Sequence, residues 1–120
     1  MDVVEILKDY FNKKSFVEFA YLFGSFARED FNNKSDIDLA ILFKDDRLDN
    51  KLQIIHELGK KLKRDIDIVS LNSIKNLYLL EDILNNNVVL KDSAKRVDFE
   101  LLKAHQILDY KEFKRVLNAS

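Results

Sequence analysis

Three aspartates and a glycine–serine pair are the residues best suited to chemistry in this chain of 120 residues. Gly24-Ser25 is followed, after ten residues, by Asp36 and then by Asp38 two positions on, and Asp67 lies in a later apolar segment. If Asp36 and Asp38 share a strand, their side chains point to one face with Cα atoms about 6.6 Å apart. Such oxygen ligands suit Mg²⁺, which keeps positions open for water and substrate phosphates. A third carboxylate from a neighbouring strand would supply enough negative charge for two metal ions.

Carboxylates this close together are unfavourable unless a cation neutralises them, because like charges raise one another's pKa and destabilise the fold. Stability alone would favour Val or Thr at Asp38, which lies within an apolar segment, whereas Asp36 could simply begin the strand from a loop. Asp65 is placed like a residue at a strand entrance. We therefore predict Asp36, Asp38 and Asp67 as metal ligands, with Asp65 as the alternative third carboxylate.

The glycine–serine pair could hold a phosphate. Gly24 allows a sharp turn and a close approach of the backbone to a ligand. Ser25 can cap a short helix beginning near Phe26, whose free N–H groups attract anions. Most such pairs are ordinary turns, so the prediction depends on their offset from the acidic strand. Arg28 and Ser35 could also reach the phosphates, although a surface role for Arg28 is equally consistent with its position.

The pattern of apolar residues predicts alternating helices and strands. Helical spacing occurs over 2–13, 51–63, 73–85 (with Ser73 as the cap) and 93–117, and short apolar or alternating runs predict strands over 16–23, 36–43, 65–71 and 88–90. The run 16–23 is apolar almost throughout, as is typical of a central strand. This order predicts one layered α/β or α+β domain over 1–120, with a core of about 1–92 and a C-terminal helix of about 93–118.

Composition excludes several classes of function. The absence of cysteine rules out disulfides, thiolate zinc sites and cysteine nucleophiles. A formal charge of −1 provides no net positive potential to attract a nucleic-acid duplex, so no direct nucleic-acid binding is expected. No segment approaches the roughly 20 apolar residues of a membrane helix, and the acidic N-terminus is unlike a signal peptide. We expect a cytoplasmic protein without a membrane partner.

The segments Gly24-Ser25-Phe26-Ala27-Arg28 and Ser35-Asp36-Ile37-Asp38-Leu39-Ala40 together resemble a known signature. This is the G-S-x(10)-D-x-D motif of the polymerase-beta nucleotidyltransferase superfamily, and Asp67 falls where that family carries its third carboxylate. The resemblance covers roughly residues 1–92 and, more loosely, the terminal helix. The chain is most similar to the minimal nucleotidyltransferases, the antitoxin halves of HEPN/MNT (type VII) toxin–antitoxin pairs.

The resemblance implies a mixed sheet flanked by helices and two-metal phosphoryl transfer that uses Mg²⁺ and ATP. By that resemblance, Asp36 and Asp38 bind the metals that hold the nucleoside triphosphate, and Asp67 binds the second metal and helps to deprotonate the acceptor hydroxyl. Gly24 and Ser25 would hold the β- and γ-phosphates. The most similar members transfer AMP to a tyrosine of a cognate HEPN toxin and silence its RNase activity, which implies a toxin partner in a hetero-oligomer, or a homodimer.

Two other functions stay open at this point. The first is a non-catalytic binding module of the same fold, although every expected catalytic position is filled. The second is a small-molecule nucleotidyltransferase of the aminoglycoside-modifying type, although such enzymes carry an extra helical domain that this chain lacks. A chain this small has room for little beyond a catalytic core, so we expect its acceptor to be chosen by surface docking. No residue identifies the base or the number of nucleotides transferred.

Overall fold

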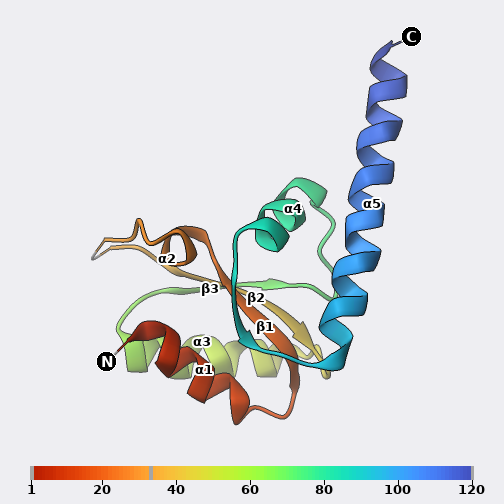
Figure 1. Ribbon diagram of the computed structural model, residues 1–120. Helices are drawn as coiled ribbons and strands as arrows, with labels where there is room; N and C mark the ends of the chain where they lie inside the picture. The colour runs from red at the N-terminus through yellow and green to blue at the C-terminus, as the bar shows by residue number, and fades with distance from the viewer. Residues whose placement is uncertain (1, 33, 120) are drawn as a thin grey trace.

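The computed structural model describes residues 2–32 and 34–119, in which helices and strands alternate as predicted (Figure 1). In chain order the elements are α1 (Val3–Asn12), β1 (Val17–Phe23), α2 (Gly24–Arg28), β2 (Ile37–Phe43), α3 (Leu48–Leu62), β3 (Ile66–Ser70), α4 (Leu77–Asn85), β4 (Val88–Lys91) and α5 (Ala94–Ala119). None of the described helices is both long enough and apolar enough to cross a membrane.

The four strands form one mixed sheet in the order β3-β2-β1-β4. β1 is antiparallel to both β2 and β4, whereas β2 and β3 are parallel and are joined through α3. β1 lies between two neighbours and all but one of its residues are buried, as the apolar run at 16–23 predicted. The mixed sheet implied by the family resemblance is therefore confirmed.

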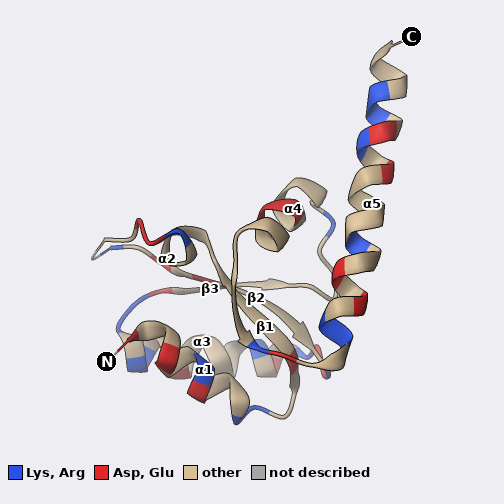
Figure 2. Cartoon of the chain, viewed as in Figure 1, with Lys and Arg blue, Asp and Glu red and all other residues tan. Residues whose placement is uncertain are grey.

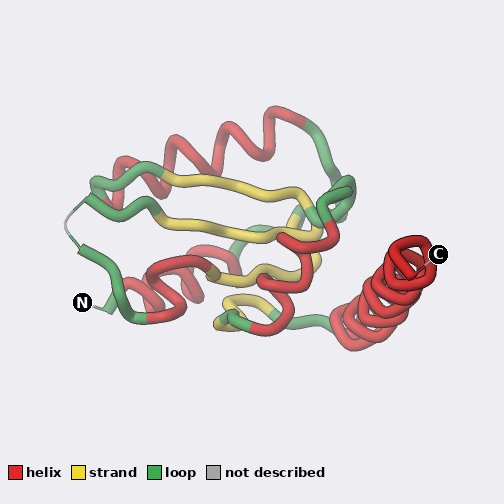
Figure 3. The backbone as a smooth tube through the Cα atoms, turned by 90° about the horizontal axis from the view of Figure 1, so that it is seen from above, coloured by secondary structure: helices red, strands yellow, loops and turns green. Residues whose placement is uncertain are grey.

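Helices cover both faces of the sheet (Figures 1 and 3). On one face, Ile37 and Leu39 of β2 pack in a core with α1 and α3. On the other face, Ala40 packs in a second core with Leu80 of α4 and Ile107 of α5. Because side chains alternate along β2, its even-numbered residues point toward the face that carries α4 and α5.

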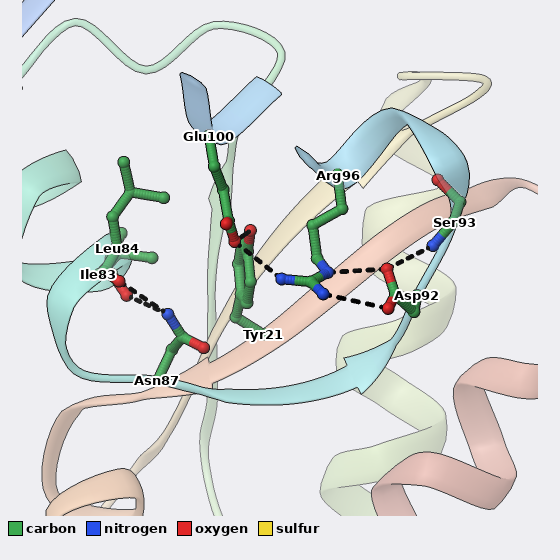
Figure 4. Close-up of polar contacts among 8 residues, drawn as sticks. All are labelled: Tyr21, Ile83, Leu84, Asn87, Asp92, Ser93, Arg96 and Glu100. Atoms are coloured by element: carbon green, nitrogen blue, oxygen red, sulfur yellow. Dashed lines mark hydrogen bonds and ion pairs between the residues drawn. The ribbon is translucent and has the colours of Figure 1, made fainter. Parts of the chain in front are cut away.

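A polar network holds the first turns of α5 against the sheet (Figure 4). The hydroxyl of Tyr21, whose side chain is fully buried in β1, donates to Glu100 Oε1 at 2.6 Å. Arg96 donates to Glu100 at 2.9 Å and to both carboxylate oxygens of Asp92 at 2.7 and 3.1 Å. The base of α5 is thus fixed by a hydrogen-bonded chain that runs from the sheet into the helix.

The apolar residues that lie at helical spacing along α5, here called its apolar stripe, are largely exposed to solvent. Val97, Leu101 and Leu108 are 54%, 60% and 64% exposed, and with Leu84 of α4 they line an open groove of about 460 Å³. In this helix Ile107 is the residue that the structure buries. The far half of α5 projects from the body, and the molecule measures 53 × 31 × 23 Å (Figure 1).

Three predicted helix starts are wrong. α2 begins at Gly24, with Phe23 in the cap position and no side-chain cap, so Ser25 lies inside the first turn rather than before it. α4 begins at Leu77, and its cap is Asn76, whose side-chain oxygen accepts from two backbone N–H groups at 3.1 Å. Ser73 instead lies in the preceding turn, because an amide oxygen directly before the helix satisfies two free donors that a hydroxyl four residues away cannot reach. α3 also starts earlier than predicted, at Leu48.

Candidate active site

The register of the sheet brings two of the predicted carboxylates together. Asp38 of β2 and Asp67 of β3 are partners in the parallel ladder, and neighbouring residues in a ladder point to the same face. Asp38 also lies opposite Phe23, the last residue of β1, which places it beside the turn that begins at Gly24. The site therefore forms where β1 ends and where β2 and β3 begin.

Asp36 and Asp65 flank this pair. Asp36 directly precedes β2 and lies two residues from Asp38, so it faces the same side. The backbone carbonyl of Asp65 accepts a hydrogen bond from Ile37 N at 2.9 Å, which fixes the start of β2 against the start of β3. Because Asp65 is two residues before Asp67 but is not the ladder partner of Asp38, the register places Asp67 nearer to that carboxylate.

Negative charge is concentrated at this point. Asp38 is half-buried, and its pKa is raised first by desolvation, then by the charges of Asp67 and Asp36. The positive charge of Arg28 lowers the pKa of Asp38 in part. Arg28 itself is exposed and forms an ion pair with Asp30 at 3.3 Å. Asp36 and Asp67 thus both lie near enough to Asp38 for their charges to raise its pKa.

Gly24 approaches the carboxylate of Asp38 directly. Its φ of +72° is a left-handed conformation, and a Cβ atom built on it would lie 2.2 Å from Asp38 Oδ2. Glycine is therefore required twice, for the conformation and for the space. Ser25 follows in the first turn of α2, and no hydrogen bond of its hydroxyl is seen within residues 2–32 and 34–119. α2 begins at Gly24, which lies beside the Asp38 carboxylate, so a phosphate group at this turn could accept from the first N–H groups of α2.

Ser35 and the basic residues around it have a different setting. The Ser35 hydroxyl oxygen accepts from Asn32 N at 2.9 Å, so this side chain shapes the loop before β2. A pocket of about 480 Å³ adjoins Asp36 on the side of α3 and is lined partly by Lys34, Lys63 and Arg64. Figure 2 shows this basic segment at the end of α3, directly before the acidic start of β3.

Sequence reasoning missed Arg64. A basic run at the end of a helix has a local explanation, because it is favourable charge at a helix C-terminus. Arg64 lies beyond the end of α3, however, and donates to two backbone carbonyls of the loop before β2. The signal that could have separated it from Lys60 and Lys61 is its position: it lies in the short connection that leads directly into an acidic strand.

The donor set fits Mg²⁺. Three carboxylates on one face supply hard oxygen ligands and leave open positions for water and phosphate. Across residues 2–32 and 34–119, no three His, Cys, Asp or Glu side chains already converge closely enough to hold an ion. A cation bound at these carboxylates would offset the repulsion that contributes to the raised pKa of Asp38.

Comparison with known proteins identifies the family. The model of the polymerase beta nucleotidyltransferase family matches residues 5–96. The chain belongs to this family. The matched range contains every candidate site residue and ends just inside α5, so this nucleotidyltransferase carries its predicted signature within the family's own domain.

Two relatives are similar in sequence to this nucleotidyltransferase. A candidate protein adenylyltransferase of Methanocaldococcus jannaschii is 34% identical over 82 residues, which cover 66% of this chain and 78% of the relative. The protein adenylyltransferase MntA of Shewanella oneidensis is 34% identical over 73 residues, which cover 59% of this chain and 50% of the relative. The chain thus matches about half the length of the Shewanella protein.

Solved structures share the fold. One is a toxin–antitoxin complex with AMP-PNP, with a TM-score of 0.73 at 24% identity over 99% of this chain and 94% of the other. Another is a tri-AMPylated HEPN toxin of Shewanella oneidensis in complex with its MNT antitoxin, with a TM-score of 0.71 at 18% identity over 98% of this chain and 97% of the other. At these identities the likeness establishes the fold, including the long helix α5.

Proposed function

We propose that this nucleotidyltransferase is an antitoxin that transfers AMP from ATP to a tyrosine hydroxyl of a HEPN-type toxin and so neutralises it. The observation that carries the proposal is the pairing of Asp38 with Asp67 beside the close approach of Gly24. In this proposal, the arrangement brings the metal ligands, the phosphate-binding turn and the carboxylate for the acceptor together in one place. Both relatives that are similar in sequence are named as protein adenylyltransferases.

Each residue has a defined task in the proposed reaction. Asp36 and Asp38 would hold Mg²⁺, and the metal when bound would supply charge neutralisation for in-line displacement at the α-phosphorus. Gly24 and Ser25 would hold the β- and γ-phosphates. Asp67 orients the acceptor hydroxyl and takes its proton. The acceptor oxygen forms a bond to the α-phosphorus while the bond to the bridging oxygen breaks, and pyrophosphate leaves.

An uncovered surface supports a protein acceptor rather than a small molecule. The apolar stripe of α5 and the adjoining groove leave Val97, Leu101 and Leu108 more than half exposed, and a contiguous apolar surface of this kind is typical of protein interfaces. The structural neighbours named above are toxin–antitoxin complexes. The same surface would serve a non-catalytic antitoxin, so chemistry must be tested separately from binding.

The test uses the chain, Mg²⁺, α-labelled ATP and a HEPN-type partner. We expect label on a partner tyrosine with the native chain and no label with Asp38→Asn, which should still bind the partner. Asp9→Asn is the matched control, since Asp9 is an exposed carboxylate on α1. Full neutralisation of the partner by Asp38→Asn would favour the binding module instead. Label on an aminoglycoside but not on the partner would favour the small-molecule reading.

A further inference from the structure

Arg64 joins two parts of the chain that are distant in sequence. It follows Lys63, a left-handed residue (φ 55°) that ends α3, and it precedes β3. Its Nη1 atom donates to the backbone carbonyls of Asn32 at 2.9 Å and of Ser35 at 3.0 Å. One guanidinium nitrogen thus connects the start of β3 to the loop that leads into β2.

The same guanidinium also contacts α2. Its central carbon lies 4.9 Å from the centroid of the Phe26 ring, and Phe26 stacks on Phe31 with centroids 4.2 Å apart and planes 6° apart. Phe26 is buried in α2, whereas Phe31 is in the loop before β2. A planar cation that stacks on a ring while it donates from its edge is a task for arginine, which a lysine ammonium performs poorly.

Asp36 lies between two of these links. The carbonyl of Ser35 accepts from Arg64, and the N–H of Ile37 donates to the carbonyl of Asp65 at 2.9 Å. The residues on both sides of Asp36 are therefore bound to two consecutive residues that lead into β3. This is the same junction that sets Asp38 opposite Asp67.

Within residues 2–32 and 34–119, Arg64 is the residue outside both α2 and the loop itself whose side chain forms hydrogen bonds with this loop. The loop's other hydrogen bonds are local, such as Asn32 N to Ser35 Oγ at 2.9 Å and Asp30 N to Ser25 O at 3.0 Å. Local bonds shape the loop, but they do not place it against β3.

We infer that Arg64 is a positioning residue that fixes the backbone of Asp36 against β3, so that the Asp36 carboxylate is held beside Asp38 for metal binding. The inference deepens the proposed function and rests on it for the role of the metal. We call the two hydrogen bonds from Arg64 to the carbonyls of Asn32 and Ser35 the clamp, and the evidence for the clamp is geometric. Arg64 acts through the loop, because its Nη1 atom donates to the backbone carbonyls of Asn32 and Ser35.

The clamp can be tested by hydrogen exchange, which does not depend on activity. We expect the amide of Ile37 to exchange at least about tenfold faster in Arg64→Ala, because its bond to Asp65 loses the adjacent tether. Arg64→Lys should restore part of the protection, since an ammonium can still donate to a carbonyl. Lys61→Ala, an exposed neighbour in α3, should leave the exchange unchanged. Native protection of Ile37 in Arg64→Ala would overturn the inference.

The consequence for the metal site is tested with Mn²⁺, whose binding is followed by electron paramagnetic resonance. We expect Arg64→Ala to weaken Mn²⁺ binding about five- to tenfold and Arg64→Lys to recover part of it. Tyr21→Phe is the matched control, because it destabilises the core at a distance from the loop and should leave Mn²⁺ affinity unchanged. Equal losses of affinity in Arg64→Ala and Tyr21→Phe would overturn the positioning role.

The two proposals fail in different ways. If Asp38→Asn binds Mn²⁺ as tightly as the native chain, the metal site of the proposed function is wrong, while the exchange of Ile37 still decides the clamp. If the native chain binds Mn²⁺ and Arg64→Ala binds it equally well, the proposed function stands and the positioning role of Arg64 is wrong.

Discussion

The chain contains two glycines, and they offer a matched pair of substitutions. Gly24 has a φ of +72°, and an added Cβ atom would lie 2.2 Å from Asp38 Oδ2 and 3.0 Å from Asp38 Cγ. Gly59 is in α3, where an added Cβ atom would meet nothing closer than 3.5 Å, an ordinary contact with the backbone oxygen of Arg64. The same Gly→Ala change therefore tests the site at one position and only the helix at the other.

Gly24→Ala is expected to act on function more strongly than on stability. A left-handed alanine costs about 1–2 kcal/mol of folding free energy. The Asp38 carboxylate must also move by about 1 Å, since an ordinary contact begins near 3.4 Å and the available separation is 2.2 Å. A displacement of about 1 Å at a reacting centre can lower the rate of transfer about 100-fold. Gly59→Ala should instead raise the free energy of unfolding by up to about 1 kcal/mol, because alanine is the better helix former.

Urea unfolding followed by far-ultraviolet circular dichroism measures the stability of both variants, and transfer of labelled AMP measures their function. The reasoning is refuted if Gly24→Ala is folded and transfers AMP within about threefold of the native rate, because Asp38 would then act without its place beside Gly24. It is also refuted if Gly59→Ala loses as much activity as Gly24→Ala.

Three further predictions use other parts of the molecule. Asp38→Asn removes one of the facing carboxylates, so we expect the metal-free variant to melt at no lower temperature than the metal-free native chain. We also expect Mg²⁺ to stabilise the native chain but not the variant. Thermal melts with and without EDTA measure both effects. Tyr21→Phe loses the bond to Glu100 and should lower the free energy of unfolding by about 1–2 kcal/mol in urea titrations. Burial and the contact with Glu100 raise the pKa of Tyr21 in the folded state. Above pH 10.0 the tyrosine therefore ionises first in the unfolded chain, and the free energy of unfolding should fall as the pH rises. This fall should be less steep in Tyr21→Phe, which lacks the ionisable hydroxyl. Leu101→Glu with Leu108→Glu, both at exposed positions, should change the free energy of unfolding by less than about 0.5 kcal/mol yet weaken partner binding measured by calorimetry; unchanged affinity would exclude this face.

Local patterns predicted most of the fold. The alternation in β2 separates Ile37 and Leu39, which are fully buried, from Asp36 and Asp38 on the opposite face. The apolar run of β1 predicted its central place because a strand with neighbours on both sides has few polar positions. These signals depend only on residues that are close in sequence, and periodicity reports them directly.

The register of β3 could not be predicted in the same way. Asp65 and Asp67 are two residues apart, so the alternation of side chains along a strand places both on the same face. Which of them lies beside Asp38 depends on how β3 aligns with β2, and that alignment is set by the length of α3 and its connections. The parallel ladder pairs Asp67 with Asp38. The role of Asp67 as a metal ligand stays a prediction until metal binding is measured.

The contacts of Arg64 and the exposure of α5 were also beyond the reach of periodicity. Arg64 binds carbonyls 29 and 32 positions away, and a basic residue after a helix has a local explanation that conceals such a contact. The stripe of α5 correctly predicted a helix, but an amphipathic pattern does not say what covers the apolar face. In this structure that face lines an open groove.

At the start of β2, the buried side chains and the predicted metal ligands lie on opposite faces, and this separation makes the proposed tests interpretable. Ile37 and Leu39 pack in the core with α1 and α3, whereas the charges of Asp36 and Asp67 raise the pKa of Asp38 on the other face, which joins the second core further along the strand at Ala40. Residues that lower stability in the absence of ligand are retained where they serve binding. Substitutions of these carboxylates should therefore leave a folded protein, so a loss of AMP transfer in Asp38→Asn would report on the site rather than on the fold.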